Sequence, residues 1–220
     1  MIRYRFIENQ IFKLYYNLPN LSFPIQPSEI IKLIPNCRYM TYKQFAEMNC
    51  CSVNYVAKIC QSDSGCCHFD SVNNRYLIIY NDNTSYGNTL GRQRWTFAHE
   101  IGHVVLDHFP IAAKELLAED RYDPYYDNIF EHEADFFAST LLSPLALFPV
   151  FDIKSAHDAR WKFGLSKTAA ENRFQAYQRW QNRYHNAFDR DIVKLYHYKN
   201  GMWIKEQFYS RFSSIYSGIT

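Results

Sequence analysis

The sequence has no long hydrophobic run. No stretch approaches the ~20 consecutive apolar residues that a membrane-spanning helix needs. Charged side chains interrupt residues 1–20, so this segment does not have the uninterrupted apolar stretch of a secretory signal. We therefore expect no membrane partner, and we predict a cytoplasmic protein.

Neither sign of charge dominates the chain. It has 24 Lys and Arg residues, 22 Asp and Glu residues and a formal net charge of +2. This balance by itself indicates neither a nucleic-acid nor a membrane partner. Internal repeats and low-complexity tracts are also absent from the sequence. Hydrophobic residues make up 47% of the 220 residues, which is enough for the core of one globular domain with an appendage.

The chain contains no C-x-x-C pair, although it has six cysteines, all within residues 37–67. In a chain of this size without a recognisable signal, we expect reduced thiols rather than a disulfide framework. A second zinc site formed by Cys60, Cys66, Cys67 and His68 is the alternative. We favour buried or incidental cysteines because the paired spacing of structural zinc sites is missing.

Hydrophobic periodicity predicts several helices and a hairpin. Apolar residues at helical spacing indicate an amphipathic helix over residues 5–18, and two longer helices follow over residues 91–107 and 129–142. Two short β-prone runs, residues 66–70 and 76–80, flank a polar turn and predict a β-hairpin. The chain therefore combines helices with at least one pair of strands.

Capping residues predict further helices. Thr41 and Ser52 are suited to begin two short helices that end near residues 48 and 60. Residues 153–183 are typical of a helix, a turn at residues 162–165 and a second helix capped by Ser166. These signals place most of the remaining chain in helices.

Two other segments lack a helical pattern. The acidic, tyrosine-rich residues 119–128 are predicted to form a loop. Near the end of the chain, residues 192–198 and 202–208 flank Asn200-Gly201, a dipeptide that favours a hairpin turn. We therefore expect a second hairpin there.

The most informative motif is His99-Glu100-Ile101-Gly102-His103, which fits the pattern H-E-x-x-H. Residues four apart share one face of a helix, so both imidazoles can converge on one cation. Glu100 lies about 100° around the helix from His99, where its carboxylate reaches a metal-bound water without binding the metal. Imidazole nitrogens suit zinc, and a catalytic zinc ion takes three protein ligands and a water. Between Trp95 and Leu106 the helix is apolar on almost every face that the motif does not occupy, which argues against simple surface histidines.

The third ligand must come from another segment. The extended metzincin pattern requires Gly and His where this chain has Leu106 and Phe109. His108 misses that pattern by one residue, and we interpret it as a partly exposed histidine at the helix end. A glutamate on a second helix is the other source, and Glu131 provides it. Asp135, one turn later on the same face, is placed to accept the free N–H of a liganding histidine.

Two neighbours of Glu131 lie off this face of the helix. His132 and Glu133 are expected to point toward solvent. Glu133 is the second choice for the third ligand. The predicted metal set is therefore His99, His103 and Glu131, with one zinc ion per chain.

These two segments resemble the ImmA/IrrE family of metallo-endopeptidases. Residues 95–106 read W-T-F-A-H-E-I-G-H-V-V-L, and residues 131–144 read E-H-E-A-D-F-F-A-S-T-L-L-S-P. The second block is similar to the family pattern E-x-E-A-N-x-F-A-x-x-L-L-M-P. It departs from that pattern at Asp135, where Asn is common, and at Ser143, where Met is common. Asp can form the same hydrogen bonds, so neither change affects the predicted metal site.

The resemblance implies an α+β, zincin-like fold, with a small twisted sheet, an active helix that carries H-E-x-x-H and a second ligand-bearing helix. It also implies a zinc-dependent endopeptidase that cleaves a helix-turn-helix transcriptional repressor in mobile-element or stress-response regulation. We expect an N-terminal helical segment at residues 1–35, the catalytic domain at residues 36–150, and a helical pair and tail packed on it at residues 151–220.

In this interpretation Glu100 is the general base, and an oxyanion donor is also needed. Tyr122, Tyr125, Tyr126 and His132 are all candidates for that donor. Two further features have both a functional and a simpler explanation. The strand 76–80 either pairs with an extended substrate or simply belongs to the core. The acidic segment 115–135 forms either a rim that favours basic substrates or a solvated loop.

The competing hypothesis is a DNA-binding or protein-binding regulator with a structural or vestigial zinc site. Residues 152–183 carry seven basic and three acidic side chains, and their helix, turn and helix vaguely resemble a helix-turn-helix. A local net charge of +4 is modest for a surface that binds phosphates, and several apolar residues of this segment are better suited to packing. We therefore prefer the peptidase and regard direct nucleic-acid binding as the weaker alternative.

Overall fold

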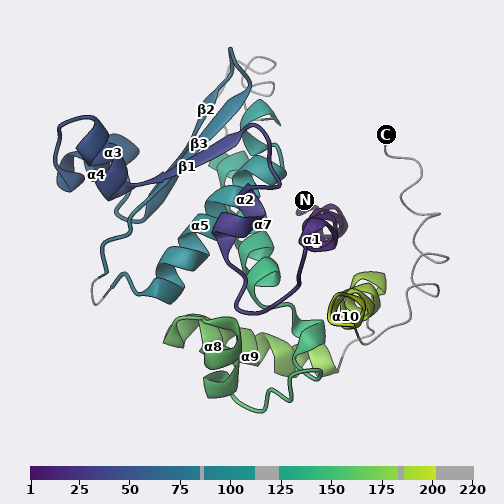
Figure 1. The fold of residues 1–220 in the computed structure, drawn as a ribbon. Helices are drawn as coiled ribbons and strands as arrows, with labels where there is room; N and C mark the ends of the chain where they lie inside the picture. The colour runs from purple at the N-terminus through teal and green to yellow at the C-terminus, as the bar shows by residue number, and fades with distance from the viewer. Residues whose placement is uncertain (85–86, 112–123, 183–185, 202–220) are drawn as a thin grey trace.

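The computed structural model describes residues 1–84, 87–111, 124–182 and 186–201. In this part of the chain the protein has an α+β fold with a small three-stranded mixed sheet and helices around it (Figure 1). This arrangement is compatible with a zincin-like fold. None of the described helices is long and apolar enough to cross a lipid bilayer.

The sheet is built from β1 (Cys37–Thr41), β2 (Gly65–Asp70) and β3 (Arg75–Tyr80), in the order β1-β3-β2. β2 and β3 form the predicted antiparallel hairpin, and β1 adds to β3 in parallel. β3 lies in the centre because its apolar side chains pack on both faces: Ile78 is completely buried in the main core, and Ile79 is buried in a second, smaller cluster. β2 is therefore an edge strand of the described sheet.

Two short helices lie at one end of the sheet, α3 (Tyr42–Met48) and α4 (Val53–Cys60) (Figure 1). Both begin at the predicted caps. The Thr41 side chain accepts a hydrogen bond from the Gln44 backbone, and the Ser52 side chain accepts one from the Tyr55 backbone. Together these helices cover the face of the sheet that carries Ile79.

The centre of the fold is the pair α5 (Leu90–Val105) and α7 (Pro124–Leu142), with α5 lying between α7 and strands β2 and β3. α1 (Tyr4–Asn17) packs on α7 from another side. The buried face of α1 includes Ile7, Ile11 and Tyr15, and these residues belong to the same core as α5 and α7. α7 is therefore covered along more than one face.

The remaining described elements complete the shell below and beside this pair (Figure 1). They are α2 (Pro27–Ile31), the 3-10 helix η1 (Leu145–Leu147), α8 (Ala156–Phe163), α9 (Lys167–Gln181) and α10 (Ala187–Lys199).

The predicted helix, turn and helix at residues 153–183 correspond to α8 and α9. Gly164 ends α8 in the left-handed conformation with φ of 62°, and the Ser166 side chain caps α9. The turn packs against α5, because the half-buried Arg94 guanidinium donates hydrogen bonds to the carbonyls of Phe163 and Gly164 at 3.1 and 2.8 Å. It also donates to the carbonyl of Ile25.

Two predictions of local structure were wrong. Residues 192–198 belong to α10 and not to a hairpin strand, because Asn186 and Asp189 form a capping box that begins a helix there. The helix expected to begin at residue 129 begins at Pro124, so part of the predicted acidic loop is helical. Residues 202–208 and the expected helix after residue 111 lie outside the described residues.

Candidate metal centre

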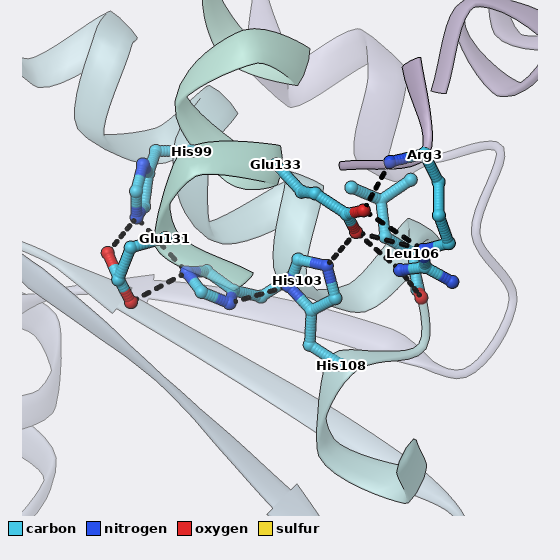
Figure 2. A network of polar contacts seen from close by, with 7 residues as sticks. All are labelled: Arg3, His99, His103, Leu106, His108, Glu131 and Glu133. Carbon is cyan, nitrogen blue, oxygen red and sulfur yellow. Dashed lines mark hydrogen bonds and ion pairs between the residues drawn. The ribbon is translucent and has the colours of Figure 1, made fainter. Parts of the chain in front are cut away.

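Two histidines of α5 point toward the same place. His99 and His103 are one turn apart, and their Nε2 atoms lie 3.1 Å from each other (Figure 2). Both side chains are 11% exposed, so they reach the surface only at this edge of α5. The predicted helix thus brings the two imidazoles of the H-E-x-x-H motif together.

Glu131 on α7 completes a group of three donors. Its Oε2 atom lies 3.1 Å from His99 Nε2, and its Oε1 atom lies 3.3 Å from His103 Nε2 (Figure 2). Hydrogen bonds from His103 and His99 hold the pKa of the Glu131 carboxyl well below its usual range, so this group is a carboxylate. The Glu131 side chain is 60% exposed, which leaves one side of the group open.

The spacing of these atoms fits a zinc ion. One donor atom from each of His99, His103 and Glu131 lies within 4.8 Å of the others. Tetrahedral coordination with metal–ligand distances of ~2.0–2.1 Å places ligand atoms ~3.3–3.4 Å apart, close to the observed separations. Two imidazoles and a carboxylate are also a known ligand set of catalytic zinc.

Asp135, one turn after Glu131, fixes the orientation of His99. The Nδ1 atom of His99 lies 3.0 Å from Asp135 Oδ1, which accepts its hydrogen. Burial lowers the pKa of His99, but the hydrogen bonds to Asp135 and Glu131 outweigh burial and raise it to about 9. A cation at Nε2 would replace the proton that these carboxylates favour.

His103 has a different partner on its far side. Its Nδ1 atom lies 3.0 Å from Nδ1 of His108 (Figure 2). His108 is only 2% exposed, so the prediction of a partly exposed histidine at the helix end was wrong. The chain reverses at Asp107, which has a φ of 56°, and this turn directs His108 back under α5. Burial and the nearby His103 lower the pKa of His108 to about 4.

Glu133 was expected to face solvent, and this prediction was also wrong. Its side chain is completely buried, and its Oε2 atom lies 3.1 Å from His108 Nε2. Arg3 donates to the same carboxylate from its backbone N–H at 2.7 Å and from Nη2 at 2.5 Å. Burial raises the pKa of Glu133, but the bonds from Arg3 outweigh this effect and lower it. The structure thus places Glu133 behind His103, away from the pair of Nε2 atoms.

Glu100 lies beside the three donors in the wall of a pocket of about 560 Å³. Its carboxylate has no hydrogen-bond partner within the described part of the chain. Burial raises the pKa of Glu100, and the nearby His103 and His99 reduce this rise. A carboxylate with these properties is suited to accept a proton from a group bound in the pocket.

β2 forms part of the wall of this pocket through Gly65, Cys66 and Cys67. The alternative that β3 pairs with a substrate was wrong, because β1 and β2 occupy both edges of β3. Burial raises the pKa of Cys66 and of Cys67, so both are neutral thiols. A second zinc site in this cysteine-rich segment is not found, since His99, His103 and Glu131 are the one such group among the described residues.

The candidate oxyanion donors are placed only in part. Tyr122 lies outside the described residues, and the side chains of Tyr125 and Tyr126 are also outside them. His132 is exposed on α7. Residues 115–123 of the acidic segment 115–135 likewise lie outside the described residues, so the expected role of this segment stays a prediction.

Comparison with known protein families places this chain in one of them. The family model described as Peptidase_M78, IrrE N-terminal-like domain, matches residues 59–175, slightly more than half of the chain. The matched segment contains β2, β3, α5 and α7, and therefore every residue of the His–His–Glu group. No curated protein matches the chain. The family comprises zinc-dependent metallopeptidases. The chain belongs to the IrrE N-terminal-like family of metallopeptidases, Peptidase_M78.

Proposed function

We propose that this protein is a zinc-dependent endopeptidase with one zinc ion per chain. His99, His103 and Glu131 would hold the ion, and Glu100 is the general base. The observation that carries the proposal is the convergence of three suitable donor atoms within 4.8 Å, at a pocket whose wall contains a carboxylate without a hydrogen-bond partner in the described structure. The α5 and α7 pair beside a small sheet supports a zincin-like arrangement.

Bound zinc would acidify the attacking water and polarise the scissile carbonyl. Glu100 accepts the proton of this water and later donates it to the leaving amine. The raised pKa of Glu100 supports the first step, because a carboxylate with a higher pKa is a stronger base and accepts the proton more readily. Asp135 accepts the Nδ1 hydrogen of His99 and so directs Nε2 toward the ion.

We further propose that an extended peptide binds along β2. β2 is an edge strand of the described sheet, and Gly65, Cys66 and Cys67 line the same pocket as Glu100. Backbone hydrogen bonds to an edge strand hold a substrate in extended form without a sequence requirement. Side chains of the pocket then decide which residues are accepted.

The substrate we propose is a helix-turn-helix transcriptional repressor. Membership of a peptidase family supports a protein substrate. The resemblance to ImmA/IrrE proteins supports the narrower choice of a repressor. We also propose that residues 36–150 form the catalytic domain, with residues 1–35 and 151–220 packed against it.

A Glu100→Gln substitution tests the mechanism. The carboxamide has nearly the same shape, so the protein should fold and bind one zinc ion per chain but lose at least ~10²-fold in cleavage rate. Cleavage of a repressor encoded beside this protein would be followed by mass spectrometry of the fragments, together with the zinc content. Glu47→Gln, an exposed change on α3, is the matched control and should cleave normally. A Glu100→Gln protein that cuts the same bond at the wild-type rate would exclude this role.

A further inference from the structure

A series of hydrogen bonds runs from the partly exposed Arg3 through the buried Glu133 and His108 to His103. Figure 2 shows Arg3, Glu133 and His108 in line behind His103, on the side away from Glu131. We propose that Arg3, Glu133 and His108 are positioning residues that hold His103 in the tautomer and orientation needed to bind zinc. This inference depends on the zinc site proposed above.

Each hydrogen bond in this series has a defined donor and acceptor once zinc occupies His103 Nε2. The remaining proton of His103 is then on Nδ1, which donates to Nδ1 of His108 at 3.0 Å. His108 must accept at Nδ1, so it carries its own proton on Nε2 and donates to Glu133 at 3.1 Å. No nitrogen of His103 or His108 is left without a partner in this arrangement.

Glu133 can accept from His108 only while its own position is fixed. Its carboxylate is completely buried, and the Arg3 guanidinium supplies the counter-charge through Nε and Nη2, while the Arg3 backbone N–H donates one more hydrogen bond. Arg3 Nη2 also donates to the carbonyl of Leu106, at the end of α5, at 3.2 Å. A buried carboxylate without such a cation would be strongly destabilised. Arg3 thus connects the end of α5, through Leu106, with α7, through Glu133, and it fixes the carboxylate to which His108 donates.

The two histidines are therefore supported in different ways. His99 has the half-exposed Asp135 as its direct partner, whereas His103 depends on three residues that end in the N-terminal segment. Arg3 lies outside the segment 59–175 that matches the peptidase family. The N-terminal segment thus contributes to metal binding as well as to the core.

Zinc affinity measured by competition with a chelator tests the proposal. His108→Phe removes both hydrogen bonds but keeps a ring, and it should weaken zinc binding by ~10–100-fold. Arg3→Met should weaken it by a smaller factor, and the double variant should be no weaker than His108→Phe alone, because Arg3 acts through His108. The control is Arg5→Met, an exposed change on α1 two residues from Arg3, which should leave the affinity unchanged.

A second measurement needs no variant. Long-range proton–nitrogen NMR spectra of the zinc-loaded wild-type protein should show His103 protonated at Nδ1 and His108 neutral and protonated at Nε2. A His108 ring protonated at Nδ1 would overturn the proposal, as would variants that fold and bind zinc within twofold of wild type. A wild-type protein that binds no zinc would instead overturn the proposed function, so the two failures are distinguishable.

Discussion

Gly102 of α5 lies directly against Ala134 of α7. A Cβ atom at Gly102 would lie 3.2 Å from the Cα atom of Ala134 and 3.1 Å from Cδ1 of Phe137. The two helices therefore approach more closely at this point than two larger side chains would permit. This approach lies next to His103 on α5 and three residues after Glu131 on α7, so it helps to bring the proposed zinc ligands of the two helices together.

Gly102→Ala should therefore destabilise the protein. The better helix propensity of alanine contributes about 1 kcal/mol in the favourable direction. The added methyl group meets the Cα atom of Ala134 and the side chain of Phe137 on α7, and overpacking of this kind costs about 1–3 kcal/mol. We expect a lower free energy of unfolding in urea together with weaker zinc binding. Gly87→Ala is the control, because a Cβ at Gly87 has no atom within 4 Å, and it should change stability little. Equal stability of both variants would contradict this account.

Measurements of zinc content can distinguish the proposed zinc ligands from neighbouring residues that do not bind the ion. Glu131→Gln should lose most of the zinc, since an amide oxygen is a weaker ligand than a carboxylate. Asp135→Ala should keep the zinc but bind it ~10–100-fold more weakly. Elemental analysis of protein purified without added metal gives the stoichiometry, and chelator competition gives the affinity. Full zinc content in a His99→Ala/His103→Ala protein would refute the assignment of the site.

Zinc affinity should increase with pH. In the metal-free protein the pKa of His99 is about 9, so near neutral pH zinc must displace a proton from this ring. One displaced proton corresponds to about a tenfold gain in affinity for each pH unit up to about 9. Release of close to one proton from His99 per zinc ion, measured by calorimetry in buffers of different ionisation enthalpy, checks this. An affinity that stays constant between pH 7 and 8.5 would contradict the prediction.

Stability of the metal-free protein should change with pH in the opposite sense. The pKa of His99 is higher in the folded state than the ~6.5 of an unfolded chain. The stability that this group contributes is therefore complete below pH ~6.5 and is lost as the pH rises through about 9. Thermal unfolding of the metal-free protein should show the decrease, and Asp135→Asn should reduce it. A melting temperature that rises across this range would be the contrary result.

Arg94→Met should loosen α8 and α9 from α5. The substitution removes the donors for the carbonyls of Ile25, Phe163 and Gly164, and each carbonyl left unsatisfied costs about 1–3 kcal/mol. We expect faster proteolysis near residue 164 as well as a lower free energy of unfolding. Arg160→Met, an exposed change on α8, is the control. Similar behaviour of the two variants would show that the Arg94 contacts are unimportant.

The sequence was most informative where the signal is local. Thr41, Ser52 and Ser166 begin helices as their side chains predict, because a cap depends only on the next few residues. The β2–β3 hairpin was found for the same reason. The spacing of His99 and His103 and of Glu131 and Asp135 was sufficient to place each pair on one helical face.

Glu133 and His108 were misjudged because their environment depends on distant residues. Glu133 is two positions from Glu131, on another face of α7, and helical periodicity alone assigns that face to solvent. That face is covered in the fold because α1 packs on it. Arg3, which binds the Glu133 carboxylate, is 130 residues away in the sequence. A buried charge pair with such separation leaves no local pattern. His108 required the reversal at Asp107, which the sequence does not signal.

The packing of α1 on α7 also has a consequence for synthesis of the chain. The hydroxyl of Tyr15 donates to the carbonyl of Leu141, which is 126 residues later. At ~5–20 residues per second a ribosome makes the intervening chain in about 6–25 s. During that interval the apolar face of α1, with Ile7 and Ile11, has been made but its partners on α7 have not. The nascent protein therefore has an interval in which this helix is open to chaperones and to other chains.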